Sequence, residues 1–217
     1  MTFVIALAGS KGGVGKSTLA AALAARATRE SDRVAFIDAE PQQSLTLWWR
    51  LRGKPNNPRC HTDSGDTAAD VEALKRGGAE WIIIDTPPLD MDRIEAAIVA
   101  ADFVLVPARP SVFDLHGTQA VAGLCQEHRK RFAFVLNAVD TVDPAWKGII
   151  RSMTSGLKKL GPLLPKTIRV RAAYVSTLNA GLSGPEHPDA RQAAGPKAEV
   201  EALWLAIKRR TGKAKGR

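Results

Sequence analysis

The sequence predicts an α/β fold with a mostly parallel, doubly wound sheet and helices on both faces. Short apolar runs alternate along the chain with segments rich in helix-forming residues, which is the pattern of such a sheet. The first run leads through a glycine-rich turn directly into a helical segment. The 217 residues suffice for one domain with a buried core and leave little room for a second.

The apolar runs are interpreted as strands buried on both faces because they are nearly continuous rather than alternating. They cover residues 2–8, 33–38, 79–85, 102–107 and 132–137. Helices are expected at 16–29, which is dense in alanine and leucine, and at about 68–76, 92–100, 114–130 and 145–160. Segment 53–66 carries turn-forming prolines and asparagines and is expected to be an irregular surface connection. We expect a single domain over residues 1–210 and a basic, mobile tail over 211–217.

Composition excludes several classes of protein. Hydrophobic residues make up 45% and charged residues 24% of the chain, as in an ordinary globular protein. No apolar run approaches the roughly 20 residues of a membrane-spanning helix. Cys60 and Cys125 form neither a paired-thiol motif nor a metal-binding spacing. A reducing, cytoplasmic location is therefore expected.

Positive charge is concentrated in the last third of the chain. Residues 1–140 hold 16 basic and 17 acidic side chains, whereas residues 141–217 hold 15 basic and 5 acidic ones. A basic region on a neutral body favours a polyanionic partner, either nucleic acid or an anionic membrane surface. A solvated basic surface without a partner is the alternative.

The glycine-rich turn between the first strand and the first helix has the composition of a phosphate-binding loop. It covers Ser10–Thr18, with the sequence SKGGVGKST. Its glycines let backbone N–H groups curl round a β-phosphate, Lys16 neutralises phosphate charge, and the Ser17 hydroxyl is a magnesium ligand. The alternative is a glycine-rich turn with two solvated lysines. The candidate nucleotide-binding residues of this loop are Gly12, Gly13, Val14, Gly15, Lys16, Ser17 and Thr18.

The loop also departs from the general phosphate-loop pattern. Its expected first glycine is Ser10, and a second lysine, Lys11, follows. This spelling resembles the deviant Walker A motif of the ParA/MinD superfamily of dimerising ATPases. The resemblance implies that Lys11 reaches across a nucleotide-sandwich homodimer to the partner's bound phosphates, so that Lys11 counts among both the catalytic and the nucleotide-binding residues.

Three further segments resemble motifs of the same superfamily. Residues 37–42, IDAEPQ, resemble an Asp-x-Asp-Pro-Gln stretch, which implies that Asp38 lies near magnesium and that Glu40 orients the attacking water. Glutamate stands where the family has aspartate, and the extra methylene is expected to affect the hydrolysis rate more than nucleotide binding. Residues 82–88, IIIDTPP, resemble a Walker B strand whose Asp85 holds Mg²⁺. Asn137 resembles the asparagine that reads the adenine edge, and a turn asparagine is its alternative.

The resemblance covers most of the chain and favours a small ParA-type partition ATPase without an amino-terminal helix-turn-helix. It implies weak, partner-stimulated hydrolysis of ATP with Mg²⁺, a ParB-like or other adaptor, and a nucleoid-associated location. Lys166, Arg169 and Arg171 resemble the late family segment that contacts DNA without sequence preference. Partition of a plasmid or chromosome and positioning of a protein organelle share all of these motifs. Other branches of the superfamily use paired cysteines at a shared cluster or act on a neutral small molecule. Nothing in this sequence supports either feature.

A MinD-like membrane ATPase is the alternative function. In segment 199–210, Val200, Leu203, Trp204 and Ile207 follow the i, i+3, i+4, i+7 spacing of an amphipathic helix, with basic residues beyond them. Such a helix more often packs on its own domain. Because the basic residues are spread over the last third, we expect DNA rather than a membrane as the partner.

Overall fold

The computed structural model describes residues 2–211, which form six strands and eight α-helices. The strands are Phe3–Leu7 (β1), Val34–Asp38 (β2), Arg59–His61 (β3), Trp81–Asp85 (β4), Phe103–Ala108 (β5) and Phe132–Leu136 (β6). The helices are Lys16–Ala27 (α1), Ser44–Leu51 (α2), Thr67–Arg76 (α3), Met91–Ala100 (α4), Val112–Glu127 (α5), Trp146–Leu160 (α6), Ala172–Leu178 (α7) and Ala190–Thr211 (α8). A short 3₁₀ turn, Gly184–Glu186 (η1), precedes α8.

The strands form one sheet in the order β3-β2-β4-β1-β5-β6, and every neighbouring pair is parallel. The predicted doubly wound α/β fold is confirmed. Because all strands are parallel, the loops after β1, β2 and β4 open at the same edge of the sheet, and the strand order reverses next to β1. Ligands bind at this edge in such folds because the backbone diverges there. The phosphate-loop candidate therefore lies where the topology places a site.

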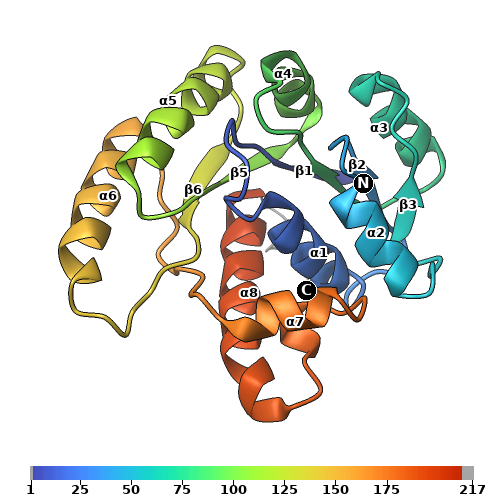
Figure 1. Ribbon diagram of the computed structural model, residues 1–217. Helices are drawn as coiled ribbons and strands as arrows, with labels where there is room; N and C mark the ends of the chain where they lie inside the picture. Colours follow the sequence, from blue (N-terminus) through green and yellow to red (C-terminus); the bar gives the residue numbers. More distant parts are fainter. Residues whose placement is uncertain (1, 212–217) are drawn as a thin grey trace.

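All strands except the edge strand β3 contribute buried side chains to two cores, one on each face of the sheet. Phe3, Ile5 and Leu7 of β1 join a cluster with α1 and α8, whereas Val4 and Ala6 join a cluster with α3, α4 and α5. Figure 1 shows α1, α2, α7 and α8 on one side of the sheet and α3 to α6 on the other. Both faces are covered, which explains the nearly continuous apolar runs.

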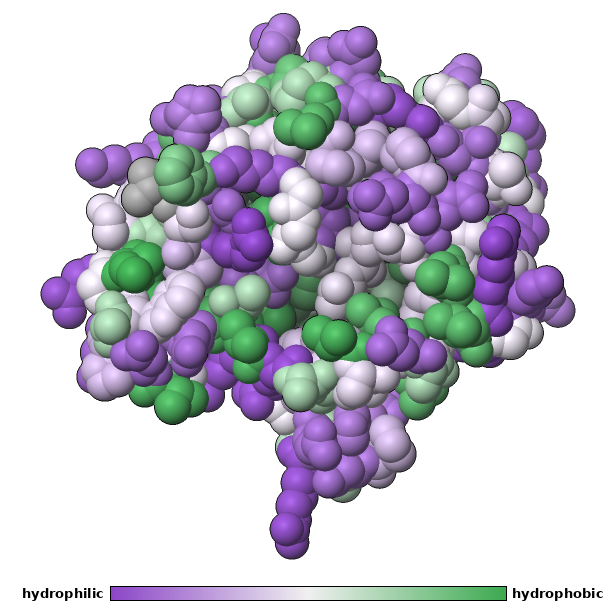
Figure 2. Space-filling model, viewed as in Figure 1, coloured by the Kyte–Doolittle hydropathy of each residue, from purple (hydrophilic) through white to green (hydrophobic). Residues whose placement is uncertain are grey.

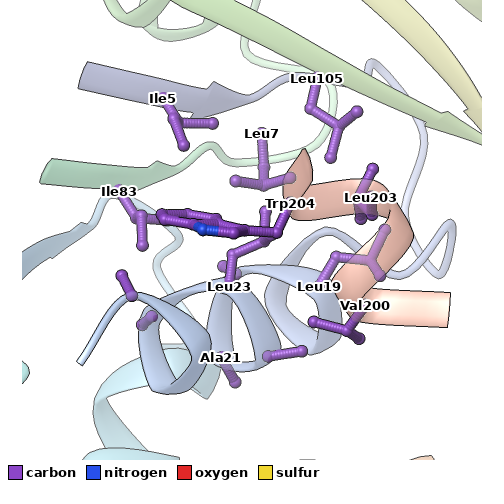
Figure 3. Packing of buried hydrophobic residues seen from close by; sticks show 14 of the residues in the cluster. Ile5, Leu7, Leu19, Ala21, Leu23, Ile83, Leu105, Val200, Leu203 and Trp204 are labelled. Carbon is purple, nitrogen blue, oxygen red and sulfur yellow. The ribbon is translucent and has the colours of Figure 1, made fainter. Parts of the chain in front are cut away.

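Helix α8 packs its apolar side against the sheet and α1. Trp204 is fully buried between Leu19 and Leu23 of α1 and the strand residues Ile5 and Ile83 (Figure 3). Its ring centroid lies 4.4 Å from that of Trp81. The remaining side chains of the predicted amphipathic stripe, Val200, Leu203 and Ile207, are also at most 2% exposed.

The burial of this stripe overturns the interpretation of α8 as a membrane-targeting helix. Burial of each large apolar side chain in the core contributes about 1.5–3 kcal/mol. Transfer of the same surface from this core to a bilayer therefore gains little. Among residues 2–211, no helix is both long enough and apolar enough to cross a membrane.

Several local expectations need correction. Segment 53–66 is not wholly irregular, because Arg59–His61 forms β3, which pairs with β2 at the sheet edge. The sequence patterns did not predict helices α2 and α7. Residues 163–170 also extend the sheet beyond β6 through backbone hydrogen bonds, including Ile168 N to Leu136 O at 2.8 Å. The predicted tail lies outside the described residues apart from Thr211, which ends α8.

Candidate functional site

The loop between β1 and α1 has the backbone shape of an anion-binding loop. Gly13 and Gly15 adopt left-handed conformations with φ of 72° and 91°, and Gly15 caps the helix that begins at Lys16. A Cβ on Gly15 would lie 2.1 Å from the side-chain nitrogen of Asn137, so no other residue fits there. The first turn of α1 carries no acidic residue. Its free N–H groups and helix dipole therefore favour a phosphate.

Lys16 lies folded into the loop and is 5% exposed. Its ammonium donates hydrogen bonds to the carbonyl oxygens of Gly9 and Lys11, both at 3.1 Å. Burial lowers the pKa of Lys16, and the nearby carboxylates of Asp85 and Glu40 oppose this shift. An anionic phosphate in the loop would favour the charged form that burial disfavours.

Asp85, at the end of β4, is completely buried. Neither of its carboxylate oxygens accepts a hydrogen bond of normal geometry from residues 2–211, because the Ser17 hydroxyl is directed at Glu40 instead. Burial raises the pKa of Asp85 to about 7, with Ser17 lowering it and Asp38 and Glu40 raising it. A buried carboxylate with two free oxygens beside a hydroxyl fits a hydrated Mg²⁺ ion. Ser17 and Asp85 are therefore the residues that would hold the metal.

Asp38 shapes the loop that carries Glu40. Its carboxylate accepts hydrogen bonds from the backbone N–H groups of Thr46, at 2.7 Å, and of Glu40, at 3.3 Å. Burial raises the pKa of Asp38, and these hydrogen bonds oppose the shift. The Glu40 carboxylate in turn accepts a hydrogen bond from Ser17 at 3.2 Å. The structure thus brings Asp38, Glu40, Ser17 and Asp85 together at the mouth of the loop, as the motifs predict.

Lys11 lies at the rim of the loop, next to its own α5. Its ammonium is 3.9 Å from a carboxylate oxygen of Asp114 and 5.2 Å from the centroid of the Phe113 ring. The side chain keeps 37% of its surface exposed. Asp114 also accepts hydrogen bonds from the backbone and side chain of Arg109. Sequence reasoning missed Asp114, although an acidic residue in a first helical turn is a common signal.

Asn137 follows β6 and is 7% exposed. Its side-chain nitrogen donates a hydrogen bond to the carbonyl oxygen of Val14 at 2.7 Å. The residue therefore fixes the phosphate loop from outside. Its predicted contact with adenine stays a prediction.

A cavity of about 440 Å³ opens beside the loop. One wall is polar and contains Gly12, Gly13, Gly15, Lys16, Ser17, Thr18, Glu40, Gln42 and Ser44. A mostly apolar wall comes from the rest of α2 and the end of α7 and contains Leu47, Trp48, Leu51, Leu178 and Asn179. Figure 2 shows hydrophobic side chains gathered at the right and in the lower middle of this face, in the region of α2 and α7. No local sequence signal pointed to the α7 residues.

The three predicted DNA-binding residues have different surroundings. Lys166 and Arg169 are exposed, on the segment that extends the sheet beyond β6. Arg171 forms an ion pair with Glu199 of α8, with its two nitrogens 2.8 and 3.0 Å from one carboxylate oxygen. Glu199 also accepts a hydrogen bond from the Tyr174 hydroxyl at 3.0 Å. Arg171 therefore fastens the start of α7 to α8.

Comparison with known proteins identifies the family. Residues 5–178 match the family model described as the CobQ/CobB/MinD/ParA nucleotide binding domain. The chain belongs to this ParA/MinD family. This match confirms the family assigned from the motifs, and the protein is therefore a nucleotide-binding ATPase.

Individual relatives span most of this ParA/MinD-family chain. Protein ParA of Rhizobium radiobacter is 31% identical over 189 residues, which are 82% of this chain and 83% of that protein. The maintenance of carboxysome distribution protein A of Halothiobacillus neapolitanus is 29% identical over 191 residues, 83% of this chain and 86% of that protein.

Solved structures share the fold. The septum site-determining protein MinD of Pyrococcus horikoshii, complexed with Mg-ADP, superposes with a TM-score of 0.71. The match covers 97% of this chain and 99% of that one, at 18% sequence identity. At this identity the similarity shows the fold alone.

Proposed function

We propose that this ATPase is a dimerising switch that binds DNA without sequence preference in its ATP state and positions a cargo. The position of Lys11 is the main support. Its ammonium lies at the rim of the phosphate loop, half-exposed, while Lys16 supplies the buried charge inside the loop. A second lysine so placed is able to reach the phosphates of a second copy.

The reaction is transfer of the γ-phosphoryl group to water, driven by positioning and charge neutralisation. Lys16 and the N–H groups of the loop hold the phosphates, and the Glu40 carboxylate orients the water. Bound Mg²⁺ would neutralise charge on the β- and γ-phosphates, held by Ser17 and Asp85. Asp38 fixes the backbone on which Glu40 stands, which favours a positioning role for Asp38.

ATP is expected to hold two copies together, because each Lys11 would contact the nucleotide of the other copy. Apolar side chains beside the cavity support this interface: Leu47 and Leu51 of α2 are 55% and 49% exposed, and Val175 of α7 is 67% exposed. Such a patch next to a charged site is typical of a surface that a partner covers. Hydrolysis would then release the dimer.

Non-specific DNA is the proposed partner of the ATP state, with a nucleoid-associated location as the consequence. Lys166 and Arg169 are exposed, and α6 adds the basic residues Lys147, Arg151, Lys158 and Lys159 to a sequence that contains no acidic residue. Contacts of lysine and arginine with phosphates carry no sequence information. A ParB-like or other adaptor would stimulate hydrolysis. One relative is named for carboxysome distribution and another only ParA, so their names single out no cargo for this chain.

Binding to random-sequence duplex DNA and to anionic liposomes tests the proposal. Each would be measured with ATP, ADP and no nucleotide across a salt series. We expect binding to DNA that is selective for ATP and falls steeply with salt, because phosphate contacts release counterions. Binding to liposomes alone, or DNA binding that ignores the nucleotide, would contradict it.

A further inference from the structure

An ion pair joins the end of α2 to η1, the short turn that follows α7, next to the apolar wall of the cavity. Arg52 directly follows α2, and its guanidinium donates to the two carboxylate oxygens of Glu186 at 2.9 and 2.6 Å. Glu186 belongs to η1, beyond the end of α7, and also accepts hydrogen bonds from Ser183. The two side chains are only 19% and 21% exposed. Shielded, two-pronged pairs of this kind are the strong ones.

The backbones of the two elements also touch at this point. Gly181 has a φ of 68°, and a Cβ there would lie 2.2 Å from the backbone nitrogen of Arg52. Arg52 donates a further hydrogen bond to the Gly181 carbonyl at 3.0 Å, and the Trp48 indole donates one to the carbonyl of Leu182 at 3.2 Å. The end of α2 and the turn after α7 therefore form one rigid joint.

The other end of α2 begins at the catalytic loop. Gln43, the residue before α2, adopts a left-handed conformation with φ of 52°, which is strained for glutamine. Glu40 holds the hydroxyl of Ser17, which is also the candidate magnesium ligand. Nucleotide binding thus competes for the hydroxyl that Glu40 now holds. ATP and ADP differ only in the γ-phosphate, and Glu40 would orient the water that attacks this group. The loop that carries Glu40 is therefore the place where the two nucleotides act differently.

Helix α7 connects the cavity to the basic segment. Leu178 and Asn179 at its end line the cavity. Its start follows Arg171, two residues after the exposed Arg169, and seven helical residues span about 10 Å. The Val170 N–H donates to the carbonyl of Val139 at 3.1 Å, which ties the basic segment to the loop after Asn137. A shift of α7 would therefore strain this contact and, through Val170, change how the neighbouring Arg169 is presented.

We propose that the Arg52–Glu186 pair couples the Glu40 loop to α7 and so lets the bound nucleotide control the DNA-binding segment 166–171. The proposal deepens the proposed function and rests on it for the DNA readout. Arg52 and Glu186 act as positioning residues, because neither lines the cavity. A nucleotide shifts the equilibrium between two conformations of the protein only if it contacts them differently. The joint would carry the effect of that difference from α2 to α7.

The test compares Arg52→Gln and Glu186→Gln with the wild type and with Arg26→Gln. Arg26 pairs with Glu201 and Glu30 and joins α1 to α8, so its loss removes a partly buried ion pair that contacts neither α2 nor α7. The affinity for duplex DNA would be measured with ATP and with ADP. Hydrogen–deuterium exchange of residues 172–178 would be followed with the same nucleotides, together with retention of labelled ATP.

We expect ATP to raise DNA affinity over ADP by about tenfold or more in the wild type and in Arg26→Gln, as is typical of coupled sites. In both joint variants this ratio falls towards one and the exchange of α7 no longer responds to nucleotide, while ATP retention is kept. Should either joint variant fail to fold, Arg52→Lys keeps the charge but loses the two-pronged geometry, and is expected to lower the ratio in part.

Two results would overturn the inference: a full ATP/ADP ratio in both joint variants, or an equal loss in Arg26→Gln. If the wild type binds no DNA in any state, the proposed function fails. The exchange of α7 then decides the inference alone, and an unchanged nucleotide response in the joint variants would reject it.

Discussion

Lys11 and Lys16 lie five residues apart, yet their ammonium groups have different surroundings. Lys16 is buried and bonded within its own loop, whereas Lys11 is half-exposed beside Asp114. We therefore expect Lys16→Ala to abolish retention of labelled ATP. Lys11→Ala should retain ATP but fail to form a dimer with it in light scattering. An ATP-dependent dimer of Lys11→Ala would reject the trans role of this lysine, and normal ATP retention by Lys16→Ala would reject the phosphate loop.

Asp85 makes the stability of the nucleotide-free protein depend on pH. Its folded-state pKa of about 7 lies above the ordinary value of 3.8, because the carboxyl is buried. The folded state therefore binds a proton more tightly than the unfolded state, and this contribution to stability is lost as pH rises towards 7. Without magnesium, Asp85→Asn should raise the melting temperature more at pH 8 than at pH 5. Equal effects at the two pH values would contradict the shift.

The same substitution separates stability from binding. An asparagine side chain lacks the negative charge that suits Mg²⁺, so Asp85→Asn should lose the gain in ATP affinity that magnesium gives. Titration of ATP with and without magnesium measures this difference. A full magnesium effect in the variant would remove Asp85 from the candidate metal ligands.

At the scale of elements, the sequence predicts those features whose residues lie close together along the chain. The phosphate loop and the strand ending at Asp85 are contiguous, so their chemistry is visible in a few letters. The strand Arg59–His61 has no apolar pattern and forms because β2 offers it backbone hydrogen bonds. The Arg171–Glu199 pair joins residues 28 positions apart, which no local pattern reveals. Likewise, α7 lines the cavity only because the fold places it there, and no local sequence pattern reveals this.

Helix α8 stabilises the fold through its buried face. Trp204 is completely buried, whereas the next residue, Leu205, is 43% exposed. Trp204→Ala should lower the free energy of unfolding by about 3–5 kcal/mol because it leaves a large cavity. Leu205→Ala, the matched control on the same helix, should cost no more than about 1 kcal/mol. Urea unfolding measures both, and similar costs for the two variants would mean that α8 is not held by the core.

At the scale of the whole molecule, the charge is divided between a neutral first part and a basic last third. The neutral part holds the nucleotide site, and the basic part holds Lys166 and Arg169 on the segment beside β6. This division lets one end of the sheet bind ATP while an adjacent surface attracts a polyanion. The net charge of +9 alone would not distinguish such a surface from an evenly basic protein.

The salt dependence of DNA binding distinguishes exposed from structural arginines. The double variant Lys166→Gln with Arg169→Gln should weaken DNA binding and reduce the slope of log K against log salt by about one per lost phosphate contact. Arg171→Gln leaves Glu199 without its ion-pair partner, so it should lower thermal stability while the slope stays unchanged. A reduced slope in Arg171→Gln would mean that this arginine leaves Glu199 to reach the DNA. An unchanged slope in the double variant would instead place the DNA contacts on the cationic surface of α6, where Lys147→Gln with Arg151→Gln should then reduce it.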